Sequence, residues 1–142
     1  METAHKTEQE KKEFFDEEEI LELKARQLAE WIKESKHFTI FTGAGISTSC
    51  GVPDFRSGIN TKLKTGPGAW EEQAQKDKVK HIKYKKTEMR KAIPSPTHMA
   101  IVELCKKGYC KFVISQNVDG LHRRSGIPPE ILAELHGNTN LE

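Results

Sequence analysis

The sequence predicts an α/β fold: part of a Rossmann-like domain, with parallel strands and flanking helices. Two short runs rich in β-branched and aromatic residues, at 38–42 and 111–115, are typical of strands. A glycine-rich turn follows the first run directly, and a helical segment with clear start and stop signals lies between the two runs. Two strands joined by such a long crossover are parallel, with a right-handed connection.

Composition restricts the class of protein. The length of 142 residues is that of one domain, and the 35% hydrophobic and 31% charged content is ordinary for a soluble protein. A net charge of +2 is too small to indicate nucleic-acid binding by itself. No apolar run approaches the roughly 18 residues of a membrane-spanning helix, and the N-terminus lacks the apolar stretch of a secretory signal. We therefore expect an intracellular protein without a membrane partner.

The three cysteines support an intracellular location. They are Cys50, Cys105 and Cys110, an odd number without C-x-x-C spacing, so we expect reduced thiols and no metal at this group.

The N-terminal region divides into a tail and a helix. Residues 1–14 are charged and nearly featureless, so we expect a disordered tail before a single domain at 15–142. Asp16 and Glu19 resemble a capping box, which predicts a helix that runs to about Ser35. Four apolar residues fall on one face of this helix: Leu21, Ala25, Leu28 and Ile32. We expect that face to pack in the core.

Two polar segments follow the first strand. Residues 57–69 are rich in Gly, Ser, Thr, Asn and Pro and are predicted to form a loop. Residues 76–91 contain eight Lys or Arg and few apolar side chains. We interpret this basic run as a solvated face, with contact to DNA or an acidic chromatin surface as the alternative.

The second half of the chain contains clear start and stop signals for helices. Ser95 as N-cap and Pro96 in the first turn begin a helix, and Gly108 ends it. A further short helical turn is expected from Asp119 to about Gly126, followed by a turn at the two prolines.

The glycine-rich turn is the first candidate site. Gly43 and Gly45 would let the backbone approach a pyrophosphate, which the amides of the following helix start could hold. However, Thr48 stands where the dinucleotide-binding fingerprint has its third glycine, which comes only at Gly51. No acidic residue follows at the usual spacing either. Spacing alone leaves two alternatives open: a nucleotide site, or a tight strand-to-helix turn.

Three longer strings resemble the signatures of the sirtuin (Sir2) family of NAD-dependent protein deacylases, in the family's order. They are GAGIS with GVPDFR within 43–56, SQNVDGLH at 115–122 and ELHGN at 134–138. THMAIVEL at 97–104 and FDEEEILELKARQLA at 15–29 are most similar to class IV, the chromatin-associated nuclear sirtuins of animals. The resemblance covers roughly residues 14–142.

The resemblance implies a role for each matched residue. The loop that holds the NAD phosphates is matched by Gly43, Ala44, Gly45 and Thr48. The P-D-F-R stretch is matched by Asp54, Phe55 and Arg56, where the phenylalanine covers the nicotinamide ribose and the arginine lies at the phosphates. Trp70 matches an NAD-contacting tryptophan of class IV across an insertion after Arg56.

The remaining matches lie in the two later strings. Gln116 matches a ribose-binding glutamine, and Asn117 and Asp119 match the pocket for the carboxamide end of NAD. His136 matches the catalytic histidine; imidazole suits a base because it exchanges a proton near neutral pH. His98 and His122 are interpreted as structural.

The implied function is NAD-dependent deacylation of protein lysines, releasing nicotinamide and O-acyl-ADP-ribose. An acyl-lysine protein, with histones as candidates, is the implied partner, and the nucleus is favoured over the cytoplasm. Protein mono-ADP-ribosyl transfer and non-catalytic binding of NAD or ADP-ribose remain alternatives. A general dehydrogenase is disfavoured by the missing ribose-binding acid.

The family's zinc site sets one further expectation. Its four cysteines come shortly after the H-G-N string, and none of them falls within these 142 residues. We therefore expect no metal ligands in this chain and zinc only in a full-length parent. Residues 15–142 are interpreted as the N-terminal part of a sirtuin catalytic domain, truncated before the zinc module. We therefore expect efficient catalysis from the full-length protein and not from this chain alone.

Overall fold

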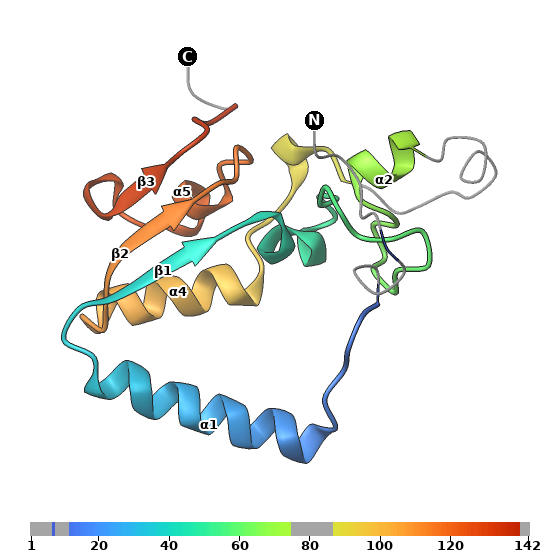
Figure 1. Ribbon diagram of the computed structural model, residues 1–142. Helices are drawn as coiled ribbons and strands as arrows, with labels where there is room; N and C mark the ends of the chain where they lie inside the picture. The colour runs from blue at the N-terminus through green and yellow to red at the C-terminus, as the bar shows by residue number, and fades with distance from the viewer. Residues whose placement is uncertain (1–6, 8–11, 75–86, 140–142) are drawn as a thin grey trace.

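The computed structural model describes Thr7 and residues 12–74 and 87–139. In chain order the elements are α1 (Glu18–Glu34), β1 (Phe38–Thr42), η1 (Ala44–Cys50), α2 (Ala69–Ala74), η2 (Met89–Lys91), α4 (Pro96–Lys106), β2 (Cys110–Ser115), α5 (Leu121–Ser125), η3 (Pro129–Ile131) and β3 (Leu132–Glu134) (Figure 1). The elements labelled η are 3-10 helices. No helix in the described part of the chain is both long enough and apolar enough to cross a membrane.

A three-stranded parallel sheet confirms the predicted α/β class. Its order is β1-β2-β3, so β2 is the central strand. Val113 of β2 lies opposite Ile40 on one side and Leu132 on the other. Both predicted strands form, whereas β3 was not predicted, because three residues are too short for a recognisable alternation.

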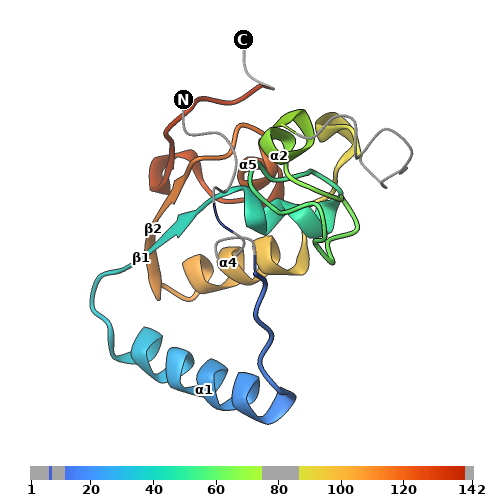
Figure 2. The same cartoon turned by 45° about the vertical axis from the view of Figure 1, so that its right-hand side comes forward.

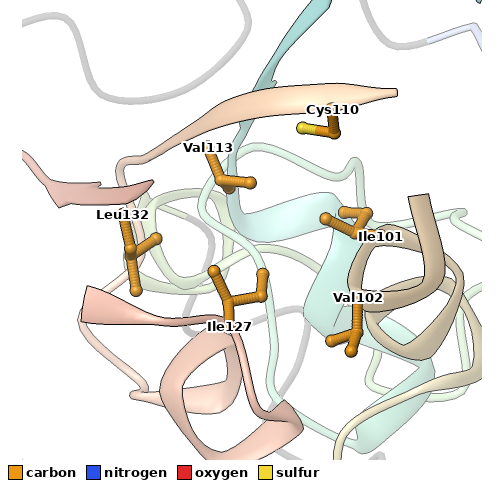
Figure 3. Packing of buried hydrophobic residues seen from close by; sticks show 6 residues of the cluster. All are labelled: Ile101, Val102, Cys110, Val113, Ile127 and Leu132. Atoms are coloured by element: carbon orange, nitrogen blue, oxygen red, sulfur yellow. The ribbon is translucent and has the colours of Figure 1, made fainter. Parts of the chain in front are cut away.

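The main core lies between the sheet and α4. Val113 is fully buried, and around it gather Ile101 and Val102 of α4, Cys110, Ile127 and Leu132 (Figure 3). Burying each large aliphatic side chain contributes roughly 1.5–3 kcal/mol, so this cluster anchors α4 to the sheet.

Local signals define α4 as predicted. The Ser95 hydroxyl accepts a hydrogen bond from the backbone N–H of His98, and the His98 ring accepts one from the N–H of Ser95, which completes a capping box. Pro96 occupies the first turn, and after the helix Gly108 takes a φ of 75°, which favours glycine. The short α5 likewise ends at Gly126, whose φ is 102°.

The helix α1 forms as predicted, but the expectation that its apolar face packs in the core is wrong. None of its residues is buried, and the exposed fractions of Leu21, Leu28 and Trp31 are 57%, 51% and 62%. Figures 1 and 2 both show α1 set apart from the sheet, on the side where α4 lies. Periodicity shows which face of a helix is apolar, but not what covers it.

The start of α1 also differs from the expected capping box. The N-cap is Glu17, which makes no side-chain capping bond, and Asp16 instead forms an ion pair with Lys24 at 2.7 Å. These side chains are exposed, so the ion pair contributes little.

Two of the predicted segments fall mostly outside the described residues. The tail at 1–14 is described at Thr7 and from residue 12, where Glu13 accepts hydrogen bonds from the Thr61 hydroxyl and the Lys62 backbone amide. Of the basic run at 76–91, only 87–91 is described, and it contains η2.

Candidate functional site

The candidate site lies where β1 and β2 end. The glycine-rich turn leaves the carboxyl end of β1 at Thr42, and the SQNVDGLH string leaves the carboxyl end of β2 at Ser115. In open parallel sheets, ligands bind outside this edge, because loops from neighbouring strands meet there. Two of the strings singled out from the sequence therefore come together at one edge of the sheet.

A cavity of about 540 Å³ opens between these loops. That size is typical of a small-molecule site, for which roughly 300–1,000 Å³ is usual. Six of the predicted site residues line it: Ala44, Phe55, Gln116, Asn117, Asp119 and His136. Its wall is completed by residues that the sequence analysis did not select, among them Ser47, Val52 and Met89.

Hydrogen bonds join the two loops across the base of the cavity. The Asn117 side-chain amide donates to the Gly43 carbonyl at 3.0 Å and to the Ser47 hydroxyl at 3.3 Å. The Ser47 hydroxyl in turn donates to Asp119 at 2.7 Å. Ser47 is only 1% exposed, so it acts as a buried link between the loops. Its signal in the sequence was its place in the GAGIS string.

Asp119 also organises its own loop. One carboxylate oxygen accepts from Ser47, and the other accepts from the backbone N–H of Leu121 at 2.9 Å, where α5 begins. The side chain is 4% exposed. A buried carboxylate is stable only with such donors, so its position is tightly determined.

An aromatic and cationic group, of which Phe55 lines the cavity, lies on the loop after the glycine turn. The rings of Phe55 and Trp70 lie 5.1 Å apart, and the Arg56 guanidinium lies 5.3 Å from the centre of the Trp70 ring. The structure thus brings Trp70 next to the P-D-F-R stretch despite the insertion between them. Phe55 is 50% exposed, which leaves its ring available to cover a ligand.

This loop is held by its own backbone and by Asp54. The Asp54 carboxylate accepts from the backbone N–H and the hydroxyl of Ser57. Gly68 packs so closely against this loop that a Cβ there would lie 2.3 Å from the backbone nitrogen of Arg56. In this structure Asp54 therefore shapes the loop.

The glycine turn leaves open space at its centre. A Cβ placed on Gly43 would lie 3.9 Å from the Gln116 side-chain oxygen, whereas one on Gly45 would meet no atom within 4 Å. The Thr48 hydroxyl donates to the Gly45 carbonyl at 2.9 Å and lines a separate cavity of about 550 Å³. The turn thus leaves room beside Gly45 for an approaching group.

His136 lies at the rim of the cavity, on the exposed turn after β3. Its Nδ1 lies 2.9 Å from the backbone carbonyl oxygen of Gln116. A carbonyl oxygen only accepts hydrogen bonds, so Nδ1 carries the proton. In the neutral ring the lone pair is then on Nε2, which is the arrangement that a general base requires.

The described residues contain no group of three or more His, Cys, Asp or Glu side chains arranged to hold a metal ion. All three cysteines are free. Burial, with Cys110 alongside, raises the pKa of Cys105 to about 11, so this thiol is protonated and inert at neutral pH.

Comparison with known proteins gives one consistent family. The sequence model described as "Sir2 family" matches residues 43–141. The NAD-dependent protein deacetylase SRT1 of Arabidopsis thaliana is 52% identical over 131 residues, covering 92% of this chain and 25% of the relative. The NAD-dependent protein deacetylase Sirt6 of Drosophila melanogaster is 45% identical, covering 92% of this chain and 37% of the relative.

Solved structures agree. A Sir2 structure with a p53 peptide and NAD+ superposes with a TM-score of 0.57 at 31% identity, covering 80% of this chain and 45% of that chain. The chain therefore spans less than half the length of each of these relatives.

Proposed function

The chain belongs to the Sir2 family, and on that premise we propose that its cavity binds NAD and serves NAD-dependent deacylation of protein lysines. The relatives SRT1 and Sirt6 are NAD-dependent protein deacetylases by name, and a structural relative holds NAD+ and a peptide together. Because the chain covers 25% and 37% of those two relatives, the activity of the whole protein is part of the proposal.

The residues present fit the phosphate and ribose part of NAD. The open space at Gly45 allows close approach of a phosphate to the backbone, and Arg56 supplies a planar cation suited to phosphate oxygens. Phe55 offers an exposed ring at the cavity wall. We assign Gly43, Ala44, Gly45, Thr48 and Arg56 to the phosphates, and Asp54, Phe55, Trp70 and Gln116 to the loop and ribose contacts. When bound, NAD supplies the ADP-ribosyl group that accepts the acyl group, with nicotinamide as leaving group.

Asn117 and Asp119 define the inner end of the pocket. A carboxamide offers one acceptor and two donors, and this end of the cavity presents an amide and a carboxylate. Their bonds to Gly43 and Ser47 hold both side chains in place before a ligand arrives. Such preorganisation lowers the free energy that binding must spend on ordering the site.

His136 is the proposed general base, and its hydrogen bond to the Gln116 carbonyl is the observation that carries the proposal. That bond fixes the proton on Nδ1 and leaves the Nε2 lone pair to receive a proton from a ribose hydroxyl. Because His136 lines the same cavity as Asn117 and Asp119, base and cofactor pocket share one space.

The finer form of the proposal concerns substrate and location. An acyl-lysine peptide is the proposed substrate, with nicotinamide and O-acyl-ADP-ribose as the small-molecule products. The likeness of segments 15–29 and 97–104 to class IV supports histone substrates and a nuclear location.

The test is turnover by the whole protein that contains these residues, with NAD and an acetylated histone-tail peptide, followed by mass spectrometry of the products. We expect nicotinamide, O-acetyl-ADP-ribose and deacetylated peptide. His136→Ala should lower the rate by about 10²–10⁴-fold, the usual contribution of a general base. His37→Ala, an exposed histidine at the far end of β1, is the matched control and should leave the rate unchanged.

The same experiment separates the alternatives. An ADP-ribosylated peptide in place of O-acetyl-ADP-ribose would indicate ADP-ribosyl transfer. Equal rates for the wild type and His136→Ala would remove His136 from its role. Failure to bind NAD in calorimetry would contradict the cavity assignment itself.

A second candidate is binding of NAD or ADP-ribose without turnover. This candidate is favoured by the matched length: the chain spans 25% of SRT1 and 37% of Sirt6. Saturable binding without any product would support this candidate over deacylation.

A further inference from the structure

Two histidines behind the candidate site are buried against each other. His98 of α4 is 0% exposed and His122 of α5 is 2% exposed. Their ring centres lie 4.9 Å apart, with the planes tilted by 56°. Neither ring lines the cavity, and the proposed reaction uses neither.

Hydrogen bonds hold the outer side of each ring, and those of His98 indicate where its proton lies. The backbone N–H of Ser95 lies 3.2 Å from Nδ1 of His98, and the Ser95 hydroxyl lies 2.8 Å from the same nitrogen. Because the backbone N–H can only donate, Nδ1 accepts, and a neutral His98 carries its proton on Nε2. On the other ring, Nε2 of His122 lies 2.8 Å from the Thr42 hydroxyl. Thr42 is the last residue of β1 and directly precedes the glycine turn.

The remaining nitrogen of each ring has no partner. Nε2 of His98 and Nδ1 of His122 are both buried without a hydrogen bond. Leaving a buried polar atom unpaired costs about 1–3 kcal/mol, so a simple packing role would be served better by an apolar side chain. Two such atoms in adjacent rings are a feature that needs an explanation.

The pair connects α4, α5 and the end of β1. His122 follows Asp119 by one turn of chain and bonds the end of β1, while His98 belongs to the cap of α4. We propose that His98 and His122 are a positioning pair, which holds the Asn117–Asp119 loop against the end of β1 only while both rings are uncharged. Its effect on NAD rests on the proposed function; its effect on the loop does not.

Charging either ring would break these contacts. A proton on Nδ1 of His98 would face the Ser95 N–H, so the ring would keep only its contact with the Ser95 hydroxyl, 2.8 Å away, and the capping box would be lost. A charge on His122 would stand beside the ring of His98 in a site without water contact. The pair therefore has one state that fits and another that loosens the loop.

The groups around the pair set the pH at which the rings become charged. Burial, and then the neighbouring His122, lower the pKa of His98 to about 4, although Asp119 opposes this. Burial also lowers the pKa of His122 against the raising effects of Asp119 and Glu134. Glu134 is itself paired with Arg123 at 2.6 Å. Because both pKa values are lowered by folding, the pair's contribution is present above about pH 6.5 and is lost as the pH falls towards 4.

The test is nuclear magnetic resonance of the 142-residue chain from pH 7.5 to 4. Imidazole nitrogen spectra should show His98 neutral with its proton on Nε2 at pH 7. As the pair gains protons, the amide signals of Gly43, Asn117 and Asp119 should shift together. A charged His98 at pH 7, or one protonated on Nδ1, would overturn the proposal without any variant.

Variants separate the effect of the pair from that of the two carboxylates that face it, Asp119 and Glu134. His98→Asn and His122→Gln keep a polar atom near the bonded nitrogen and remove the charge, so the shared shift between pH 6.5 and 4 should shrink or disappear. His37→Gln is the matched control and should leave that shift unchanged. The same shift in the wild type and in the double variant would overturn the proposal.

NAD binding provides the last readout. We expect the NAD affinity of the wild type to fall about twofold from pH 7 to pH 4, where about half of the His98 rings are charged, because apparent affinity scales with the fraction of binding-competent protein. The double variant should lose most of this dependence. A loop shift without NAD binding at any pH would contradict the proposed function and leave the positioning pair. A loop shift with the same NAD affinity at both pH values would overturn the pair's role in the site.

Discussion

The helices α1 and α4 are both amphipathic, yet only α4 is built into the fold. α4 has 11 residues and buries His98, Ile101 and Val102, whereas α1 has 17 residues and buries none. α4 also begins with a complete capping box, while the N-cap of α1 makes no side-chain bond. The difference teaches that periodicity and length are enough to predict a helix, but that burial depends on what lies opposite its face.

The largest expected effect tests the two apolar faces directly. Ile101→Ala removes a buried side chain of α4 and should lower the free energy of unfolding by about 2–5 kcal/mol. Leu28→Ala, on the exposed face of α1, should change it by no more than about 0.5 kcal/mol. Urea unfolding of both variants checks this. An equally large loss in Leu28→Ala would show that the face of α1 is covered in solution.

A smaller effect is expected from the two helix starts. Ser95→Ala removes the hydroxyl that caps α4 and should cost about 1 kcal/mol. Glu17→Ala removes no capping bond and should leave stability nearly unchanged. Thermal unfolding followed by circular dichroism measures both. A Glu17→Ala variant as destabilised as Ser95→Ala would mean that α1 is capped in a way this geometry does not include.

The smallest effect is expected where α1 and α4 are alike. Both helices carry an exposed i,i+4 ion pair: Glu22 with Arg26 in α1, and Glu103 of α4 with its C-cap residue Lys107. Glu22→Gln and Glu103→Gln should each cost about 0.3–0.5 kcal/mol, and added salt should reduce that cost. Unfolding at low and high salt tests this. Clearly unequal costs would place part of the difference between the helices in their charged faces.

Much of the fold could be predicted because its signals are local. The strand at 38–42, the cap at Ser95 and the glycine after α4 each depend on a few neighbouring residues, and each is present in the structure. Whether the apolar face of α1 is buried, and which strand β3 pairs with, depend on residues far along the chain. Neither can be obtained from the pattern of a single segment.

The site shows the same division. The three strings identified which loops matter, and the structure brings Phe55, Asn117 and His136 to one cavity. Ser47 was missed because its role is a contact with Asp119, 72 positions away. The bond between Thr42 and His122 spans 80 positions and leaves no trace in local spacing.

The partner of His136 has a consequence for how this protein can vary. The acceptor that orients the imidazole is the main-chain oxygen of Gln116, which every amino acid at that position would also supply. A point mutation at Gln116 therefore keeps the carbonyl that holds the proton of His136 on Nδ1. Substitution at position 116 could alter ligand contacts while the base keeps its protonation pattern. In evolutionary terms, selection on the side chain at 116 acts through the proposed ribose contact and not through the orientation of the base.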